Sequence, residues 1–302
     1  MSPREHIPVL LDESLALLDA GREGIYIDGT LGLAGHAEAI LARNPRARLI
    51  GIDLDARSLA KAQDSLRPYG DRVELFHANF KDIPELDLDF AAVRGILLDL
   101  GMSSYQLDAP DRGFGHAQDG FLDMRMDERN KLTAAKILEK YPEPKLAQLF
   151  REYGELKQAN KLARKIASVR RTQKIESPAH LRGLVEEVCR WIPQRGKIHP
   201  AAKVFQALRI EVNQELAGLG ESLAGMLGRV GPGARLAVIS FHSLEDRIVK
   251  HTFARLARPE YGDPVIDILT KHPVVPSDGE AVRNPRSRSA KLRAAAKRPH
   301  GS

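Results

Sequence analysis

The sequence has little cysteine, few aromatic residues and no long apolar run. Its single cysteine, Cys189, cannot form an internal disulfide or a cysteine-based metal site, which is typical of a reducing compartment. No apolar run approaches the roughly 20 residues that cross a bilayer, and the N-terminal residues lack the basic and apolar regions of a signal peptide. These absences predict a soluble, cytoplasmic protein with no membrane partner.

The charge of the chain is divided unevenly. Residues 1–130 hold 14 basic and 23 acidic side chains, whereas residues 131–213 hold 18 basic and 8 acidic ones. Residues 214–282 are close to neutral, and residues 283–302 hold 7 basic and no acidic side chains. The net charge of +6 therefore conceals two basic regions, and this pattern predicts a polyanionic partner.

Short apolar runs alternate with helical patterns through the first hundred residues, which predicts βαβ units and a parallel sheet. The predicted strands are 25–28, 48–53, 72–77, 95–100 and 235–240. Residues 101–130 show no clean period and are interpreted as a functional loop. We therefore expect an α/β, Rossmann-like sheet formed by residues 1–132 and 214–302.

Residues 133–213 contain helical patterns and no strand pattern, so we expect them to form an inserted all-helical domain. The predicted helices are 134–140, 146–153, 159–170, 179–191 and 201–216. A further helix is expected from Ser243 to Arg255, with Ser243 and Asp246 as an approximate capping box.

The strongest constellation lies at the end of the first predicted strand. Asp28 is followed by a turn with Gly29, Gly32 and Gly35, and Asp53 ends the second strand. Small residues allow a ligand close to the backbone, and a carboxylate at the second position accepts both hydroxyl protons of a ribose. The glycine spacing does not match the dinucleotide fingerprint and suits the cationic nucleoside S-adenosylmethionine better.

Three further side chains follow the next strands. Asn79 offers an amide to an adenine edge, and Phe80 offers either a face for stacking or a core aromatic ring. Asp99 ends the fourth strand, where a buried carboxylate without a partner would be costly.

Several longer motifs resemble those of a known family, the bacterial 16S rRNA (cytosine-N4) methyltransferases of the RsmH or MraW type. The resemblance runs in order from His6 to about Lys297, nearly the whole chain. The matching segments are 26–36, 97–104, 111–114, 122–127, 205–213, 240–246 and 284–293.

The resemblance implies a class I methyltransferase that uses S-adenosylmethionine to methylate the N4 amine of a cytidine in the decoding region of 16S rRNA, within the small ribosomal subunit. The cofactor-binding positions that it implies are Ala34, Gly35, His36, Asp53, Phe80, Asp99 and Gln106. Ala34 stands where the family has glycine, and we expect its methyl group to fit if φ there is negative.

The chemistry is an in-line displacement at the sulfonium methyl group. Cytosine N4 is a poor nucleophile because its lone pair is conjugated with the ring, so we expect Asp99 and its neighbours to orient the amine. Cys189 lies within a predicted helix of the insert, which argues against a covalent cysteine mechanism. His242 and Ser243 could face the acceptor, although Ser243 could equally be a helix cap. No metal is expected.

The basic regions are interpreted as the RNA-binding surface. In the insert this surface includes Lys157, Lys161, Arg164, Lys165, Arg170, Arg171 and Lys174, and Gln206, Arg209 and Asn213 share one helix face. The basic tail 283–302 is expected to contribute as well. Two other functions remain open, a nicotinamide-dependent oxidoreductase and a ribosome-assembly factor without turnover. The oligomeric state is expected to be a monomer or a homodimer.

Overall fold

The structure, a computed structural model, describes residues 7–117, 120–192 and 199–299. It divides into two compact units, a sheet unit and a helical unit. The sheet unit combines Met1–Gly101 with Gly218–Ser302, and the helical unit is the intervening segment Met102–Ala217. No helix in the described part of the chain is long and apolar enough to cross a membrane.

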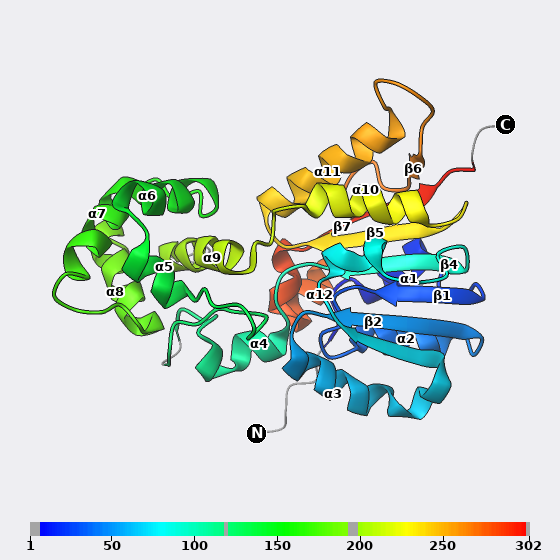
Figure 1. Cartoon of the computed structure of the whole chain (residues 1–302), viewed down its shortest axis with the longest axis horizontal. Helices are drawn as coiled ribbons and strands as arrows, with labels where there is room; N and C mark the ends of the chain where they lie inside the picture. Colours follow the sequence, from blue (N-terminus) through cyan, green and yellow to red (C-terminus); the bar gives the residue numbers. More distant parts are fainter. Residues whose placement is uncertain (1–6, 118–119, 193–198, 300–302) are drawn as a thin grey trace. The chain divides into compact units, whose positions relative to one another are not determined.

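The sheet unit is built on a sheet of seven strands, counted over the described residues (Figure 1). The strands are β1 Gly24–Asp28, β2 Ala47–Asp53, β3 Val73–His77, β4 Val93–Asp99, β5 Arg235–Ser240, β6 Ile266–Ile268 and β7 Lys291–Lys297. Their order is β3-β2-β1-β4-β5-β7-β6, with β1 to β5 parallel and β7 antiparallel to both neighbours. The predicted α/β, Rossmann-like class is confirmed.

Helices cover both faces of this sheet. They are α1 Leu11–Leu18, α2 Gly35–Arg43, α3 Ala56–Leu66, α10 Leu219–Arg229, α11 Ser243–Ala257 and α12 Asp278–Arg283, with 3-10 turns at Arg67–Arg72, Phe80–Glu85 and Pro285–Ser289. Successive strand residues point to opposite faces, so Tyr26 packs in the core that includes α1 and α2 while Ile27 packs in the core that includes α10 and α11. Each fully buried side chain of this size contributes about 1.5–3 kcal/mol.

The basic tail is largely part of the sheet. Strand β7 pairs with β5 on one side and β6 on the other, and its Leu292 and Ala294 are completely buried. The Arg293 Nε donates to Asp246 Oδ1 at 2.7 Å, so this positive charge is neutralised within the unit. The tail is thus not a free extension over β7, and the contribution of residues 283–302 to RNA binding stays a prediction. The alanines of Ala294–Ala296 have low strand propensity, which hid the strand from sequence analysis.

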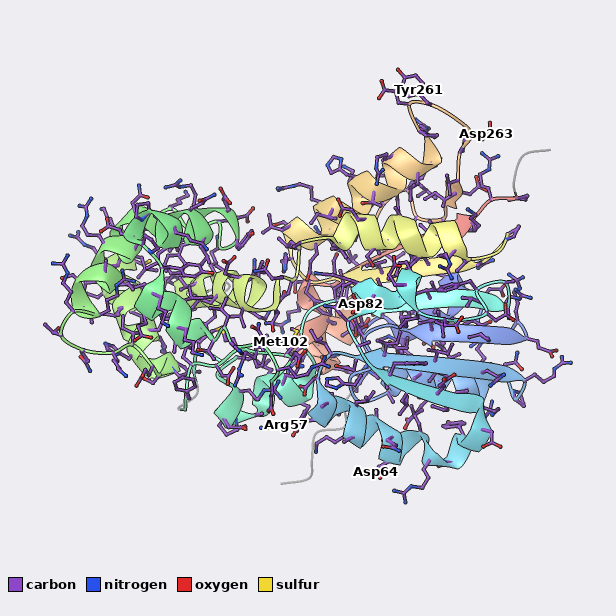
Figure 2. All side chains as sticks on the ribbon, in the orientation of Figure 1. Arg57, Asp64, Asp82, Met102, Tyr261 and Asp263 are labelled. Carbon is purple, nitrogen blue, oxygen red and sulfur yellow. The ribbon has the colours of Figure 1, made fainter. Side chains whose placement is uncertain are left out.

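Strand β6 follows α11 through a surface loop. Figure 2 shows Tyr261 and Asp263 on this loop, and the Tyr261 side chain is 87% exposed. The strand is only three residues long and forms the edge of the sheet beside β7. A run this short carries no measurable periodicity, so this strand could not be predicted from the sequence.

The helical unit contains no strand within its described residues. Its helices are α4 Ser104–Asp108, α5 Ala134–Lys140, α6 Glu143–Glu152, α7 Ala159–Val169, α8 Pro178–Cys189 and α9 Pro200–Asn213, with a 3-10 turn at Pro110–Arg112. Ser177 caps α8, where its Oγ accepts from His180 N, and Pro178 takes the first helical position.

The helical unit begins earlier than the 133–213 insert expected from the sequence. Phe114, Leu122 and Met124 belong to its core. Asn213 ties the same segment to the end of α9, because its Oδ1 accepts from Met126 N at 2.7 Å and its Nδ2 donates to Met124 O at 2.8 Å. Outside α4 and the 3-10 turn, the described residues between 113 and 132 are aperiodic because they pack as irregular backbone held by such side-chain bonds.

The polar side of α9 is occupied by internal contacts. Gln206 Nε2 donates to Tyr153 O at 3.0 Å, and the Arg209 guanidinium forms a two-bond pair with Glu215. Arg209 and Glu215 side chains are each only 10% exposed. Helical spacing thus identified a shared face correctly, but the face stabilises the helical unit instead of presenting its polar groups to RNA.

Candidate active site

Carboxylates end three strands of the sheet unit, and they are buried at Asp28 and partly buried at Asp53 and Asp99. Asp28 ends β1, Asp53 ends β2 and Asp99 ends β4. The order of strands reverses between β1 and β4, and ligands of open α/β sheets bind at the carboxyl ends of the strands beside such a reversal. Burial raises the pKa of both Asp28 and Asp99, and the negative charges of Asp53 on Asp28 and of Asp28 on Asp99 raise them further.

The glycines of the loop after β1 serve the fold in different ways. A Cβ at Gly29 would lie 2.5 Å from Leu98 Cδ2, and one at Gly35 would lie 2.5 Å from Pro8 Cγ. Gly32 has a φ of 55°, a left-handed conformation that favours glycine. Gly29 and Gly35 are therefore required by packing against the protein itself, and Gly32 is required by the turn.

Ala34 does not have the negative φ that was expected. Its φ is 67° and its ψ is 15°, so it is a left-handed residue at the N-cap of α2. The side chain is completely buried. The loop therefore keeps a conformation suited to glycine although an alanine occupies it, at a cost of about 1–2 kcal/mol.

Asp53 closes this loop onto β2. Its Oδ2 accepts from Gly32 N at 2.7 Å, and its Oδ1 accepts from Asp55 N at 2.8 Å. Burial raises its pKa to about 6 despite these bonds. Burial also raises the pKa of Asp28 to about 7, with the bond from Thr30 N opposing the shift. Each carboxylate oxygen has a second lone pair, so Asp53 can still accept from ribose hydroxyls.

Asp99 is the least satisfied of the three carboxylates. Its backbone N donates to Thr30 Oγ1, which fixes the end of β4 to the loop after β1. Its Oδ1 is buried and has no hydrogen-bond partner in the described part of the chain. Burial, followed by the negative charges of Asp28 and Glu245, raises its pKa well above the usual range. A buried oxygen without a partner is costly, and a ligand that donates hydrogen bonds or carries positive charge relieves that cost.

His36 lies beside Asp99 in the first turn of α2. Its Nε2 is 3.0 Å from Val9 O, and because a carbonyl only accepts, Nε2 carries the proton. The Nδ1 lies 3.9 Å from Asp99 Oδ2, beyond hydrogen-bond distance. His36 is therefore a neighbour of Asp99 and is not hydrogen-bonded to it at this separation.

The remaining predicted residues lie in separate places. Asn79 Oδ1 accepts from Lys81 N at 3.0 Å, so this amide caps the turn that begins at Phe80. Phe80 is half-buried, and its Cβ lies beside Gly29. Gln106 belongs to the helical unit, where it is buried and its Oε1 accepts from Ser103 N in the capping box of α4. The structure thus brings Phe80 to the loop, and Gln106 is described only within its own unit.

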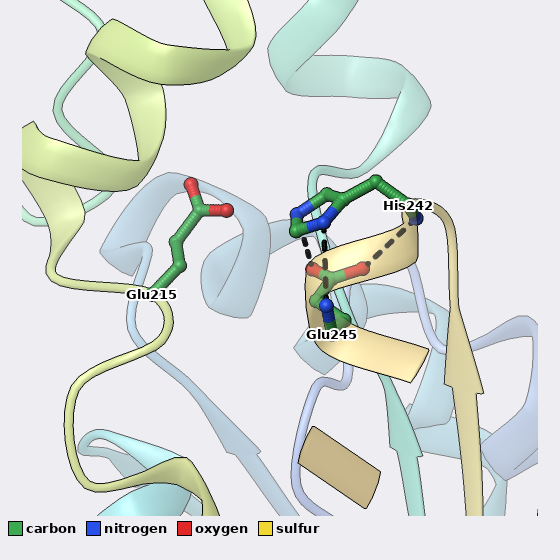
Figure 3. A group of neighbouring side chains, drawn as sticks. All are labelled: Glu215, His242 and Glu245. Atoms are coloured by element: carbon green, nitrogen blue, oxygen red, sulfur yellow. Dashed lines mark hydrogen bonds and ion pairs between the residues drawn. The ribbon is translucent and has the colours of Figure 1, made fainter. Parts of the chain in front are cut away.

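A histidine and a glutamate begin α11, as Figure 3 shows. His242, not Ser243, is the N-cap: its Nδ1 accepts from Glu245 N, and Glu245 Oε2 accepts from Phe241 N and His242 N. The expected capping box was therefore shifted by one residue. Glu245 is 2% exposed, and its burial was not predicted from the sequence. A glutamate three residues after an N-cap is typical of a capping box, and this spacing was the available signal.

The arrangement defines a class of protein. A tight turn after β1, a carboxylate after β2 and an incompletely satisfied carboxylate after β4 are the parts of a nucleoside-binding α/β enzyme. The clustered carboxylates disfavour anionic phosphates and favour a ligand with positive charge. S-adenosylmethionine fits, because it carries a ribose, a sulfonium and an ammonium group.

Comparisons with known proteins identify the family. Residues 3–298 match the model of the MraW methylase family. A relative from Heliobacterium modesticaldum, named ribosomal RNA small subunit methyltransferase H, is 46% identical over 97% of this chain and 98% of its own length. A relative of the same name from Symbiobacterium thermophilum is 44% identical over 97% of this chain and 96% of its own length.

A solved structure from Streptococcus mutans, titled a putative methyltransferase in complex with SAH, aligns over 96% of this chain and 99% of its own, with 12% identity and a TM-score of 0.44. Similarity at that level carries no weight for function.

The chain belongs to the MraW methylase family. The expected cofactor, S-adenosylmethionine, is confirmed, and the nicotinamide-dependent alternative is wrong.

Proposed function

We propose that the protein transfers a methyl group from S-adenosylmethionine to the N4 amine of a cytidine in the decoding region of 16S rRNA. Methylation of small-subunit rRNA is the activity in the names of its relatives, and 46% identity over nearly the whole chain supports the same substrate class. The position of the methyl group on cytidine rests on the resemblance of the motifs around Asp99 and on the chemistry of this site.

The cofactor would be held by the loop after β1 and by the strand ends. Asp53 would accept from the ribose hydroxyls, and Phe80 would contact the adenine. Asp99 would meet the positively charged end of the cofactor. The proposed set is completed by Ala34, Gly35, His36 and Gln106. When bound, the cofactor supplies an electrophilic methyl group.

The observation that carries the proposal is the carboxylate of Asp99. A buried oxygen without a partner, at the end of β4, is suited to accept a hydrogen bond from an exocyclic amine. Such a bond draws the amine lone pair out of conjugation with the ring and aligns it for attack. The target base must be unpaired or flipped to reach a site of this kind.

The proposal is tested by transfer of a labelled methyl group from S-adenosylmethionine to small ribosomal subunits from cells that lack the enzyme. The labelled rRNA is digested to nucleosides, and we expect the label in N4-methylcytidine. Label at carbon 5 or on a ribose would contradict the N4 assignment. Absence of label from a protein that binds both cofactor and subunit would favour the assembly factor without turnover.

Replacement of Asp99 tests the same site at the level of one group. Asp99→Ala removes the carboxylate, and we expect methyl transfer to fall by at least the roughly 100-fold loss typical of removing one aligned polar group. Asp99→Asn keeps the size and removes the charge. Single-turnover transfer and cofactor binding are measured together, and wild-type values of both in Asp99→Ala would exclude the proposed role.

A further inference from the structure

The sheet unit contains a groove formed by α11, β6, β7 and the segments beside them. Its volume is about 420 Å³. Figure 1 shows α11 running next to the β6 and β7 edge of the sheet. The groove is lined by Lys250, Phe253, Ala254, Ala257, Arg258, Ile266, Asp267, Ile268, Thr270, Lys271, Arg293 and Arg298. None of these residues belongs to the proposed cofactor site.

The floor of the groove is apolar and well packed. Phe253 is 2% exposed and Ile266 is 1% exposed, and both belong to the core beneath α11. Thr270 is also buried, and its Oγ1 accepts from Ala294 N at 3.0 Å. The groove is therefore a built depression on a stable part of the sheet unit.

The rim of the groove is basic. Two of its arginines have acidic partners: Arg293 pairs with Asp246, and Arg298 Nε lies 3.5 Å from Asp267 Oδ1. Lys250, Arg258 and Lys271 are exposed and have no ion pair within the described residues. Three of the five basic side chains in the lining thus have no acidic partner among the described residues, which leaves a surplus of positive charge.

The composition of the groove indicates the chemistry of its partner. Its volume is within the range of roughly 300–1,000 Å³ that accommodates a small ligand or one unit of a polymer. The one aromatic ring in its lining, Phe253, is buried, so no face is available for stacking a base. Basic side chains around a groove that offers no stacking surface are suited to bind the phosphates of an RNA backbone, not its bases.

We propose that this groove binds the phosphate backbone of the substrate rRNA, as an RNA contact of the sheet unit itself. The proposal deepens the proposed function and rests on it. Lys250 and Lys271 supply mobile ammonium groups, and Arg258 supplies a planar guanidinium that can bind one phosphate through two hydrogen bonds. These contacts position the RNA and carry no sequence information.

The test is the binding of small ribosomal subunits, from cells that lack the enzyme, to the full-length protein over a series of salt concentrations. In Lys250→Glu/Lys271→Glu we expect binding at physiological salt to weaken roughly 10- to 30-fold, because each lost phosphate contact also removes its released counterion. The slope of log affinity against log salt should fall by about 1.5 for the two contacts.

The matched control is Arg43→Glu/Arg48→Glu. Both arginines are exposed on the sheet unit, neither lines the groove, and the double change alters the net charge by the same amount. We expect this variant to bind subunits like the wild type. Thermal unfolding and cofactor affinity are measured for both variants and should match those of the wild type.

Equal weakening in the two double variants would show only a general charge effect and would overturn the proposal. Wild-type binding in the groove variant would overturn it as well. Sedimentation at several concentrations completes the test, because loss of self-association without loss of subunit binding would assign the groove to a second copy of the chain. Binding without methyl transfer would overturn the proposed function while leaving the groove assignment intact.

Discussion

At Ala34 the backbone has a left-handed conformation, which could not be predicted from the sequence. The sequence revealed an alanine in place of glycine, and only the structure revealed that its φ is 67°. Glycine spacing predicted a tight turn correctly, but left-handed geometry at one residue depends on how β1, the loop and α2 join in three dimensions. The same limit applies to Asp99, whose position was predicted and whose unpartnered oxygen was not.

Substitution of Ala34 tests this conformation. Ala34→Gly should change the free energy of unfolding by less than about 1 kcal/mol, because relief of the left-handed strain is offset by the entropy of glycine and the loss of a buried methyl group. Ala34→Val should lower it by more than about 2 kcal/mol, because a β-branched side chain is disfavoured at positive φ and the site is full. Urea unfolding of both variants provides the values, and a tolerated valine would mean that φ is negative in solution.

The carboxylates of Asp28 and Asp53 give the free protein a pH dependence. Their pKa values are raised to about 7 and about 6 from a usual value of 3.8. The folded state therefore holds protons more tightly than the unfolded state, so these groups lower the stability of the free protein as pH rises from about 4 to about 7. A bound cation would reverse this cost by stabilising the charged carboxylates.

At the scale of elements, strands with strong apolar character were predictable and weak ones were not. The inner parallel strands β1, β2, β4 and β5 contain buried runs of apolar residues, so their pattern is continuous, whereas β3 at the edge is only partly buried. The sequence of β7 resembles a charged tail because Lys291, Arg293 and Lys297 are separated only by Leu292 and three alanines. Its place in the sheet depends on pairing with β5 and β6, contacts that lie far away in the sequence.

The start of α11 carries a prediction of its own. His242→Ala removes the cap and should cost about 1 kcal/mol of stability, whereas Ser243→Ala should change it by less than about 0.5 kcal/mol. His242→Asn restores a good cap. Chemical unfolding and methyl transfer are measured in parallel: recovery of both by asparagine assigns His242 a capping role, and recovery of stability alone places its ring in the reaction. A larger loss for Ser243→Ala would contradict the observed cap.

At the scale of the whole molecule, the net charge is divided between the two structural units differently from its division between sequence segments. The helical unit holds 21 basic and 15 acidic side chains, and the sheet unit holds 25 of each. The net charge of +6 thus belongs to the helical unit. Within the basic cluster around α7, several members already have partners: Arg164 pairs with Glu143, Lys165 with Glu187 and Lys174 with Glu176. Arg170 donates to the carbonyls of Leu138 and Tyr141.

The other members of that cluster, Lys157, Lys161 and Arg171, are exposed and have no ion pair within the described residues. If the helical unit contacts RNA, their replacement by alanine should weaken binding to small ribosomal subunits by roughly fivefold per contact and reduce the salt slope by about 0.7–0.9 for each. Arg170→Ala serves as the comparison, since it should lower stability without changing the salt slope. An unchanged slope in the triple variant would remove this surface from the RNA interface.

The central claim is that the carboxylates at the strand ends hold the cationic cofactor, and calorimetry of S-adenosylmethionine binding at pH 6.5 tests it most directly. Because the cation favours charged carboxylates, binding to the wild type should release protons, seen as a heat that varies with the ionisation enthalpy of the buffer. Asp28→Asn should release fewer protons, while protonation of the ligand itself is common to both proteins. Equal proton release by the two proteins, with unchanged affinity in Asp99→Ala, would contradict the claim.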